Sequence, residues 1–178
     1  CTDKTGTLTL NQLTITRIVE PRAGKPMDAV QGQQLITLAL AASDVRQSAE
    51  QLLGDPLDVA VAQKWMALSE ENLATAQQQV VRSYAFDVEK RRSGGIVKQG
   101  EQSFFVVKGA FEAIRPMVTA VGMEAGTGQG TALAQQLAAS EAVMQQLAAQ
   151  GLRVIAVAYR PLSPVEQTEA MARTQTAS

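Results

Sequence analysis

The sequence predicts an α+β fold built on an antiparallel β-sheet. Helical and strand-like segments alternate in mixed order, without repeated β-α-β units. Three strand-like segments, VVRSYAF (80–86), IVKQG (96–100) and QSFFVVKG (102–109), follow one another closely, which is typical of an antiparallel meander. The glycine-containing segment RRSGG (91–95) is predicted to be the turn between the first two of them.

Apolar residues at helical spacing predict helices beside this sheet. In the segment after Gly54, Pro56 suits a first helical turn and Asp55 suits the N-cap. Gly151 stands where a C-terminal glycine cap belongs. The predicted helices cover residues 33–42, 56–68, 111–121 and 132–150.

The remaining segments are assigned from their local patterns. Residues 13–19 (LTITRIV) alternate like a strand, and 152–160 (LRVIAVAYR) form a buried strand. Residues 20–26 (EPRAGKP) contain two prolines and a glycine and are predicted to be a loop. GTGQG (126–130) lacks the lysine of a P-loop, so we expect a flexible surface connection. The polar residues of the last dozen positions are expected to be loose.

Composition excludes several classes of function. The chain has 178 residues, 46% of them hydrophobic and 19% charged, which suits one globular domain. A net charge of -1 argues against a nucleic-acid partner. One cysteine leaves no internal disulfide, and zero histidines leave neither an ordinary zinc site nor a histidine acid or base. Chemistry must use carboxylates, lysines, arginines and backbone amides. Because the chain does not start with Met, we expect a fragment.

The opening CTDKTGTLT contains a candidate nucleophile, Asp3. A carboxylate can attack phosphorus and form an acyl phosphate. Lys4, Thr5 and Gly6 would supply a charge, a hydroxyl and backbone amides for an oxyanion. The same DKTG string is also favourable turn chemistry, so on its residues alone both interpretations stay open.

The full CTDKTGTLT string resembles the phosphorylation signature of the P-type ATPases. The resemblance implies that Asp3 accepts the γ-phosphate of ATP, that Lys4 and Thr5 lie beside it, and that Asp3 and Thr5 help to hold Mg²⁺. The related phosphatases of the haloacid-dehalogenase superfamily carry a second Asp where this chain has Thr5. That departure favours a pump over a phosphatase.

Four further segments resemble the signatures of that family's nucleotide-binding domain, in the family's order. The resemblance implies a twisted antiparallel sheet flanked by helices and covers the chain to about residue 159. It divides the chain into the start of the phosphorylation domain and hinge (1–12), the nucleotide-binding domain (13–160) and a polar tail leading back (161–178). The four segments are GDPLDVAV (54–61), FDVEKRRSGG (86–95), VKGAFE (107–112) and LRVIAVAYR (152–160).

The FDVEKRRSGG segment implies an aromatic and a basic ligand-binding residue. By resemblance Phe86 stacks on adenine, whereas its residue type alone also permits a place in the core. Arg91 stands in the family's basic position, although EKRR is also an ordinary solvated turn. A methionine usual near the end of this stretch is missing, since Ser93 and Gly94 lie there.

The other segments imply the rest of the adenine pocket. Lys108 is placed at its base, with Gly109 permitting close backbone approach; spacing alone favours a lysine that points to water. Asp58 is implied to accept from the adenine amino group, while Asp55 serves mainly as an N-cap. Arg153 is implied to contact the phosphates or ribose, the alternative being a buried salt bridge.

The expected function is therefore ATP binding in a membrane P-type ATPase that transports cations through an aspartyl-phosphate intermediate, with ATP and Mg²⁺ as cofactors. We expect the chain alone to bind ATP or ADP without turnover, because the remaining phosphorylation, actuator and transmembrane domains are partners that it lacks. The absence of a His-Pro pair argues against the heavy-metal branch, and the small size suggests a bacterial inner-membrane pump. The alternatives are a free-standing aspartate phosphatase and a non-catalytic interaction domain.

Overall fold

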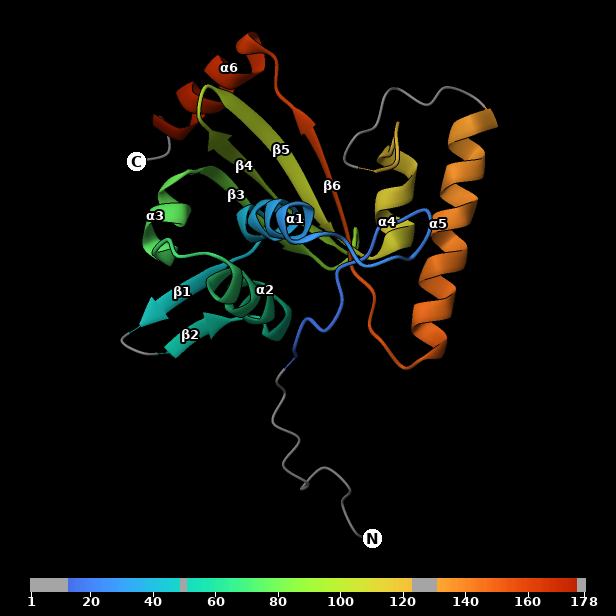
Figure 1. The fold of residues 1–178 in the computed structure, drawn as a ribbon. Helices are drawn as coiled ribbons and strands as arrows, with labels where there is room; N and C mark the ends of the chain where they lie inside the picture. Colours follow the sequence, from blue (N-terminus) through green and yellow to red (C-terminus); the bar gives the residue numbers. More distant parts are fainter. Residues whose placement is uncertain (1–12, 49–50, 123–130, 176–178) are drawn as a thin grey trace, which may run out of the picture.

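A four-stranded antiparallel sheet lies at the centre of the computed structural model, which describes residues 13–48, 51–122 and 131–175 (Figure 1). The strand order is β3-β4-β5-β6, so β3 and β6 are the edges. The α+β prediction and the antiparallel meander are confirmed. The strands are β3 (Val80–Asp87), β4 (Arg92–Gln99), β5 (Gln102–Gly109) and β6 (Ala156–Pro161).

The turn between β3 and β4 differs from the prediction. It covers residues 88–91, whereas RRSGG, which we expected to turn, lies mostly inside β4. The two glycines of that segment serve close packing. A Cβ on Gly95 would lie 1.9 Å from the carbonyl oxygen of Ala41, so only glycine lets the neighbouring helix approach the strand.

That neighbouring helix is α1 (Ala29–Ala41), which crosses the sheet in front of its strands (Figure 1). It begins earlier than predicted because Asp28 caps it, accepting from the backbone N–H of Gln31 at 2.8 Å. Its apolar residues pack on one face of β4 and β5. The buried residues of this layer are Leu38, Ala41, Ala42, Val97 and Val106.

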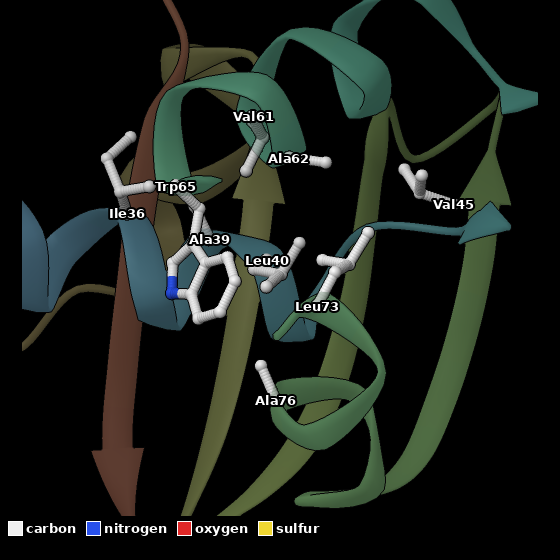
Figure 2. Packing of buried hydrophobic residues seen from close by; sticks show 9 residues of the cluster. All are labelled: Ile36, Ala39, Leu40, Val45, Val61, Ala62, Trp65, Leu73 and Ala76. Atoms are coloured by element: carbon white, nitrogen blue, oxygen red, sulfur yellow. The ribbon is translucent and has the colours of Figure 1, made fainter. Parts of the chain in front are cut away.

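A second group of helices packs on the other side of α1 (Figure 2). Helix α2 (Pro56–Leu68) has the predicted bounds and carries Trp65, which is 2% exposed and donates from Nε1 to Thr37 Oγ1 at 3.2 Å. Two short elements there were not predicted. They are α3 (Leu73–Gln78), capped by Asn72, and a hairpin of β1 (Val45–Ser48) with β2 (Gln51–Gly54).

After β5 the chain forms a shorter helix than predicted. Helix α4 (Phe111–Ile114) passes into a 3₁₀ turn (Arg115–Met117) containing Pro116, which cannot continue an α-helix. Helix α5 (Thr131–Ala149) agrees with the prediction, and Gly151 follows it with a φ of 78°.

The final helix, α6 (Pro164–Gln175), replaces most of the loose tail that we expected. Ser163 N donates to Glu166 Oε2 at 2.9 Å, and Glu166 N donates to Ser163 Oγ at 3.4 Å, which is a capping box. Hydrogen bonds from Arg160 and Ser163 lower the pKa of Glu166 to about 2.

Helix α6 lies on the face of the sheet opposite α1. Ala170 packs there with Ile96, which alternates along β4 with the α1-facing Val97. The predicted strand at 13–19 is wrong: the segment is irregular, and only Val19 forms a bridge, to Pro26. In the described ranges no helix is both long and apolar enough to cross a membrane.

Candidate functional site

A buried lysine, Lys108, lies near the end of β5 and is 2% exposed. Its Nζ donates to Ser43 Oγ at 2.8 Å and to Asp58 Oδ1 in an ion pair. Asp58 Oδ2 also accepts from the backbone N–H of Asp44 at 2.9 Å. Burial lowers the pKa of Lys108, while the carboxylates of Asp58 and Asp55 act in the opposite direction. Protein groups therefore hold the ammonium in place.

Three elements meet to build this Lys108 cluster. The first turn of α2 carries the carboxylate, β5 carries the lysine, and the segment just after α1 carries the serine. Ser93 lies opposite Lys108 in the β4–β5 register, and its Oγ donates to the carbonyl oxygen of Ala42 at 2.7 Å. Together with the close approach at Gly95, this bond fixes the end of α1 on the sheet.

Phe86 lies near the end of β3, in a β-bulge of the β3–β4 pair. Tyr84 pairs with Gly94 and Asp87 with Arg92, so two residues of β3 face one of β4 between these pairs. The Phe86 side chain is 58% exposed. It therefore does not fill the core, and the core alternative for this residue is wrong.

Arg91 closes the turn after Phe86 in a left-handed conformation, with a φ of 52°. Its carbonyl oxygen accepts from the backbone N–H of Ala110 at 3.2 Å. A Cβ on Gly109 would lie 2.4 Å from that same oxygen. The turn thus packs backbone to backbone against the end of β5, which is why glycine is needed there.

These residues gather at one end of the sheet. Arg92 pairs with Gly109, and Gly109 pairs with Ala156 at the start of β6. The turn after Phe86, the end of β5 and the start of β6 are therefore adjacent. The Lys108 cluster lies one residue further along, since Lys108 pairs with Ser93.

The arrangement agrees with a known family. The model of the P-type ATPase cytoplasmic domain N matches residues 32–177 of the chain. The chain belongs to this family. The fold around the N domain's sheet, α+β with flanking helices, is the one expected for it.

Three relatives show how much of a P-type ATPase this N domain represents. A probable cation-transporting P-type ATPase of Mycoplasma genitalium is 28% identical over 95% of this chain and 17% of its own length. The calcium-transporting ATPase of Bacillus subtilis is 27% identical, over 93% of this chain and 22% of its own. Calcium-transporting ATPase 1 of Lactococcus lactis is 30% identical, over 92% of this chain and 19% of its own length. The chain spans about a fifth of the length of these relatives.

The acidic residues of the N domain's GDPLDVAV segment have structural partners. Asp55 caps α2, accepting from the backbone N–H of Leu57 at 2.9 Å, as predicted. Lys108 does not point to water, so that alternative is wrong. Asp58 holds Lys108, and its contact with an adenine amino group stays a prediction.

Arg153 is not on a buried strand. It lies exposed in the irregular segment that leads to β6, which begins only at Ala156. A buried salt bridge is therefore excluded for Arg153. Because Ala156 pairs with Gly109, the segment enters at the same end of the sheet as the turn after Phe86.

The predicted phosphorylation residues Asp3, Lys4 and Thr5 lie outside the described residues, as does the glycine loop at 126–130. Among the residues that the structure describes, no group of three or more His, Cys, Asp or Glu side chains is placed to hold a metal ion. The predicted Mg²⁺ ligands Asp3 and Thr5 therefore stay a prediction.

Phe86, Arg91 and Arg153 are exposed at the end of the sheet, and Lys108 is buried beneath the same end. Two hollows of about 340 Å³ each are found in the described part of the chain, and both are elsewhere. One lies beside Gln78 and Lys98, and the other lies between α1 and the segment around Ile18. Neither hollow is lined by an aromatic residue, whereas the end of the sheet carries the exposed Phe86 and the exposed Arg91.

Sequence reasoning missed three polar residues of this region: Ser43, Ser93 and Glu112. Ser43 follows the predicted helix at 33–42, so a hydrogen bond across the chain to Lys108 left no local signal. Ser93 belongs to RRSGG, for which the sequence predicts a turn, whereas the structure places it in β4. Glu112 lies in the first turn of α4, with its Oε2 3.7 Å from Arg91 Nη2.

Proposed function

We propose that this N domain binds ATP and ADP at the end of its sheet. The observation that carries the proposal is the exposure of Phe86 in a chain with few aromatic residues. An exposed aromatic ring offers a face on which adenine stacks, a contact of about 1–3 kcal/mol per base. Arg91, five residues further along the chain, closes the turn that follows and offers a cation for phosphate.

The residues present fit a nucleotide as two groups, one of exposed side chains and one of buried, paired side chains. Phe86, Arg91 and Arg153 are exposed and are proposed to contact the base, the phosphates and the phosphates or ribose, respectively. Lys108 and Asp58 already neutralise each other, so we propose that they form the polar base of the adenine site, beside Gly109 and Asp55. Water between Asp58 and the adenine amino group would suit the short carboxylate side chain.

We further propose that the chain acts within a larger membrane polypeptide that couples ATP hydrolysis to cation transport. There, the Asp3 carboxylate would attack the γ-phosphorus of ATP and ADP would leave, with Lys4 and Thr5 beside the transferred group. Mg²⁺, when bound near Asp3 and Thr5, would neutralise phosphate charge. The phosphorylation, actuator and transmembrane domains are the proposed partners, and a bacterial inner membrane is the proposed location.

This proposal keeps the predicted division of the chain. Residues 1–12 would belong to the phosphorylation domain and hinge, 13–160 would bind the nucleotide, and 161–178 would lead back. The chain alone would bind nucleotide without turnover.

Titration of the isotope-labelled chain with Mg-free ATP, followed by amide NMR, tests the proposal. Saturable shifts are expected around Phe86, Lys108 and Arg153. Phe86→Ala should weaken binding by about 1–3 kcal/mol, or roughly 5- to 150-fold. Val88→Ala is the matched control, because Val88 is a 78% exposed apolar residue of the same turn. Equal affinities for wild type and Phe86→Ala, or no shifts at millimolar ATP, would contradict the proposal.

A further inference from the structure

We propose that Glu112 is a built-in competitor for Arg91, which the phosphates of a bound nucleotide must displace. The inference rests on the proposed function, because it concerns the phosphate side of the same site. It assigns to Glu112 a role in setting the affinity for phosphorylated ligands.

Three consecutive basic residues lie at the end of this turn and the start of β4, and two of them are engaged by short contacts. Lys90 Nζ lies 3.1 Å from Asp87 Oδ2. Arg92 Nη1 donates to the carbonyl oxygen of Ala113 at 3.3 Å. Among the described residues, the charged partner of Arg91 is Glu112 alone, and at 3.7 Å the two groups are too far apart for a hydrogen bond. Arg91 is thus the cation that a ligand can capture most readily.

The backbone keeps Glu112 beside Arg91. The bond from Ala110 N to Arg91 O, and the close approach at Gly109, join the turn to the start of α4. Glu112 follows in the first turn of that helix. Both side chains are 61% exposed, so water and ions reach them freely. A weakly held, solvated pair of this kind yields to an anion of higher charge.

A phosphate chain is such an anion, and it can accept two parallel hydrogen bonds from a guanidinium. Glu112 opposes its binding twice, since the carboxylate attracts Arg91 and repels the incoming phosphates. Adenosine has no phosphates, and its binding is therefore independent of this pair. Glu112 thus lowers the preference of the site for ATP over adenosine.

Affinities of the 178-residue chain for Mg-free ATP and for adenosine, measured at low ionic strength, test this inference. Glu112→Gln should tighten ATP binding about two- to fivefold and leave adenosine binding unchanged. Glu89→Gln is the matched control. It removes the same charge from the turn that carries Arg91, and the Glu89 side chain makes no hydrogen bond or ion pair with any residue that the structure describes. It should change ATP binding less than Glu112→Gln does.

A double-mutant cycle completes the test. In an Arg91→Gln background, Glu112→Gln should tighten ATP binding less than it does in the wild type, because only the direct repulsion of the phosphates is then relieved. The inference is overturned if Glu112→Gln leaves ATP affinity unchanged, if Glu89→Gln has the same effect, or if the gain in ATP affinity is equally large without Arg91. A chain that binds both ATP and adenosine, but whose ATP affinity does not respond to Glu112→Gln, overturns this inference alone. A wild-type chain that binds neither ligand overturns the proposed function as well.

Discussion

Lys108 and Arg91 are basic residues at the same end of one sheet, yet their surroundings are opposite. The Lys108 side chain is 2% exposed and its ammonium has two oxygen partners, Asp58 and Ser43. The Arg91 side chain is 61% exposed and faces one carboxylate at 3.7 Å. One cation is enclosed by the fold, and the other is left at the surface.

The difference separates the residues that hold the fold from those that are free to meet a ligand. Removing the charge of Lys108 leaves a carboxylate without its partner inside the protein, which disturbs folding. Removing Arg91 or Phe86 takes away exposed groups and should leave folding nearly unchanged. Substitutions in the two regions should therefore affect different measurements.

The largest expected effect on stability is in the enclosed region, at Gly95. Gly95→Ala places a methyl group against the carbonyl oxygen of Ala41, so α1 must move off the sheet. We expect a loss of at least about 4 kcal/mol in the free energy of unfolding, measured with urea. Gly100→Ala is the control, since a Cβ there meets nothing within 4 Å and the positive φ alone should cost about 1–2 kcal/mol. Equal losses at the two positions would break the comparison.

Lys108→Met should have the next largest effect. It leaves Asp58 partly buried without its ion-pair partner, and we expect a loss of about 3 kcal/mol in the free energy of unfolding. Adding Asp58→Asn should recover part of that loss, because the unpaired charge is then gone. Urea unfolding of both single variants and the double variant measures this coupling. A Lys108→Met protein as stable as the wild type would place Lys108 with the exposed residues instead.

The smallest expected effect is a pH dependence in the exposed turn. The backbone N–H and the ammonium of Lys90 lower the pKa of Asp87 below 3.8. The folded state thus holds the proton less tightly than the unfolded state, so the stabilisation is present above the unfolded pKa. It is lost as pH falls through the folded pKa. The difference in unfolding free energy between wild type and Asp87→Asn should shrink over that acid range. A difference that stays constant down to about pH 2 would contradict this.

Capping residues and prolines predicted where a helix begins, because they act within a single turn. Asp55 and Pro56 marked the start of α2, and its end at Leu68 also agreed, because cap and proline act within one turn. The capping-box residues Ser163 and Glu166 are equally local and would have revealed α6. The polar composition of the last dozen residues predicts a loose tail, but the capping box at Ser163 starts a helix there.

The features that local patterns did not predict depend on contacts between distant segments of the chain. The alternating residues 13–19 form no strand, because Ile15 and Ile18 pack on the core beside α1 and α2 instead of pairing with a sheet. The site was predicted residue by residue from resemblance, but the sequence did not indicate that Asp58 holds Lys108, which is 50 residues away. The exposure of Phe86 likewise depends on a bulge that no local pattern marked.

The contact between Gly95 and Ala41 also has a consequence for amide hydrogen exchange. Because helix and strand backbones touch there, amide protons of α1, β4 and β5 should exchange together, through opening of a large cooperative unit. The turn at 88–91 can open by itself. A ligand at Phe86 and Arg91 would slow exchange in the turn first, so one hairpin would report occupancy at its tip and global unfolding along its strands.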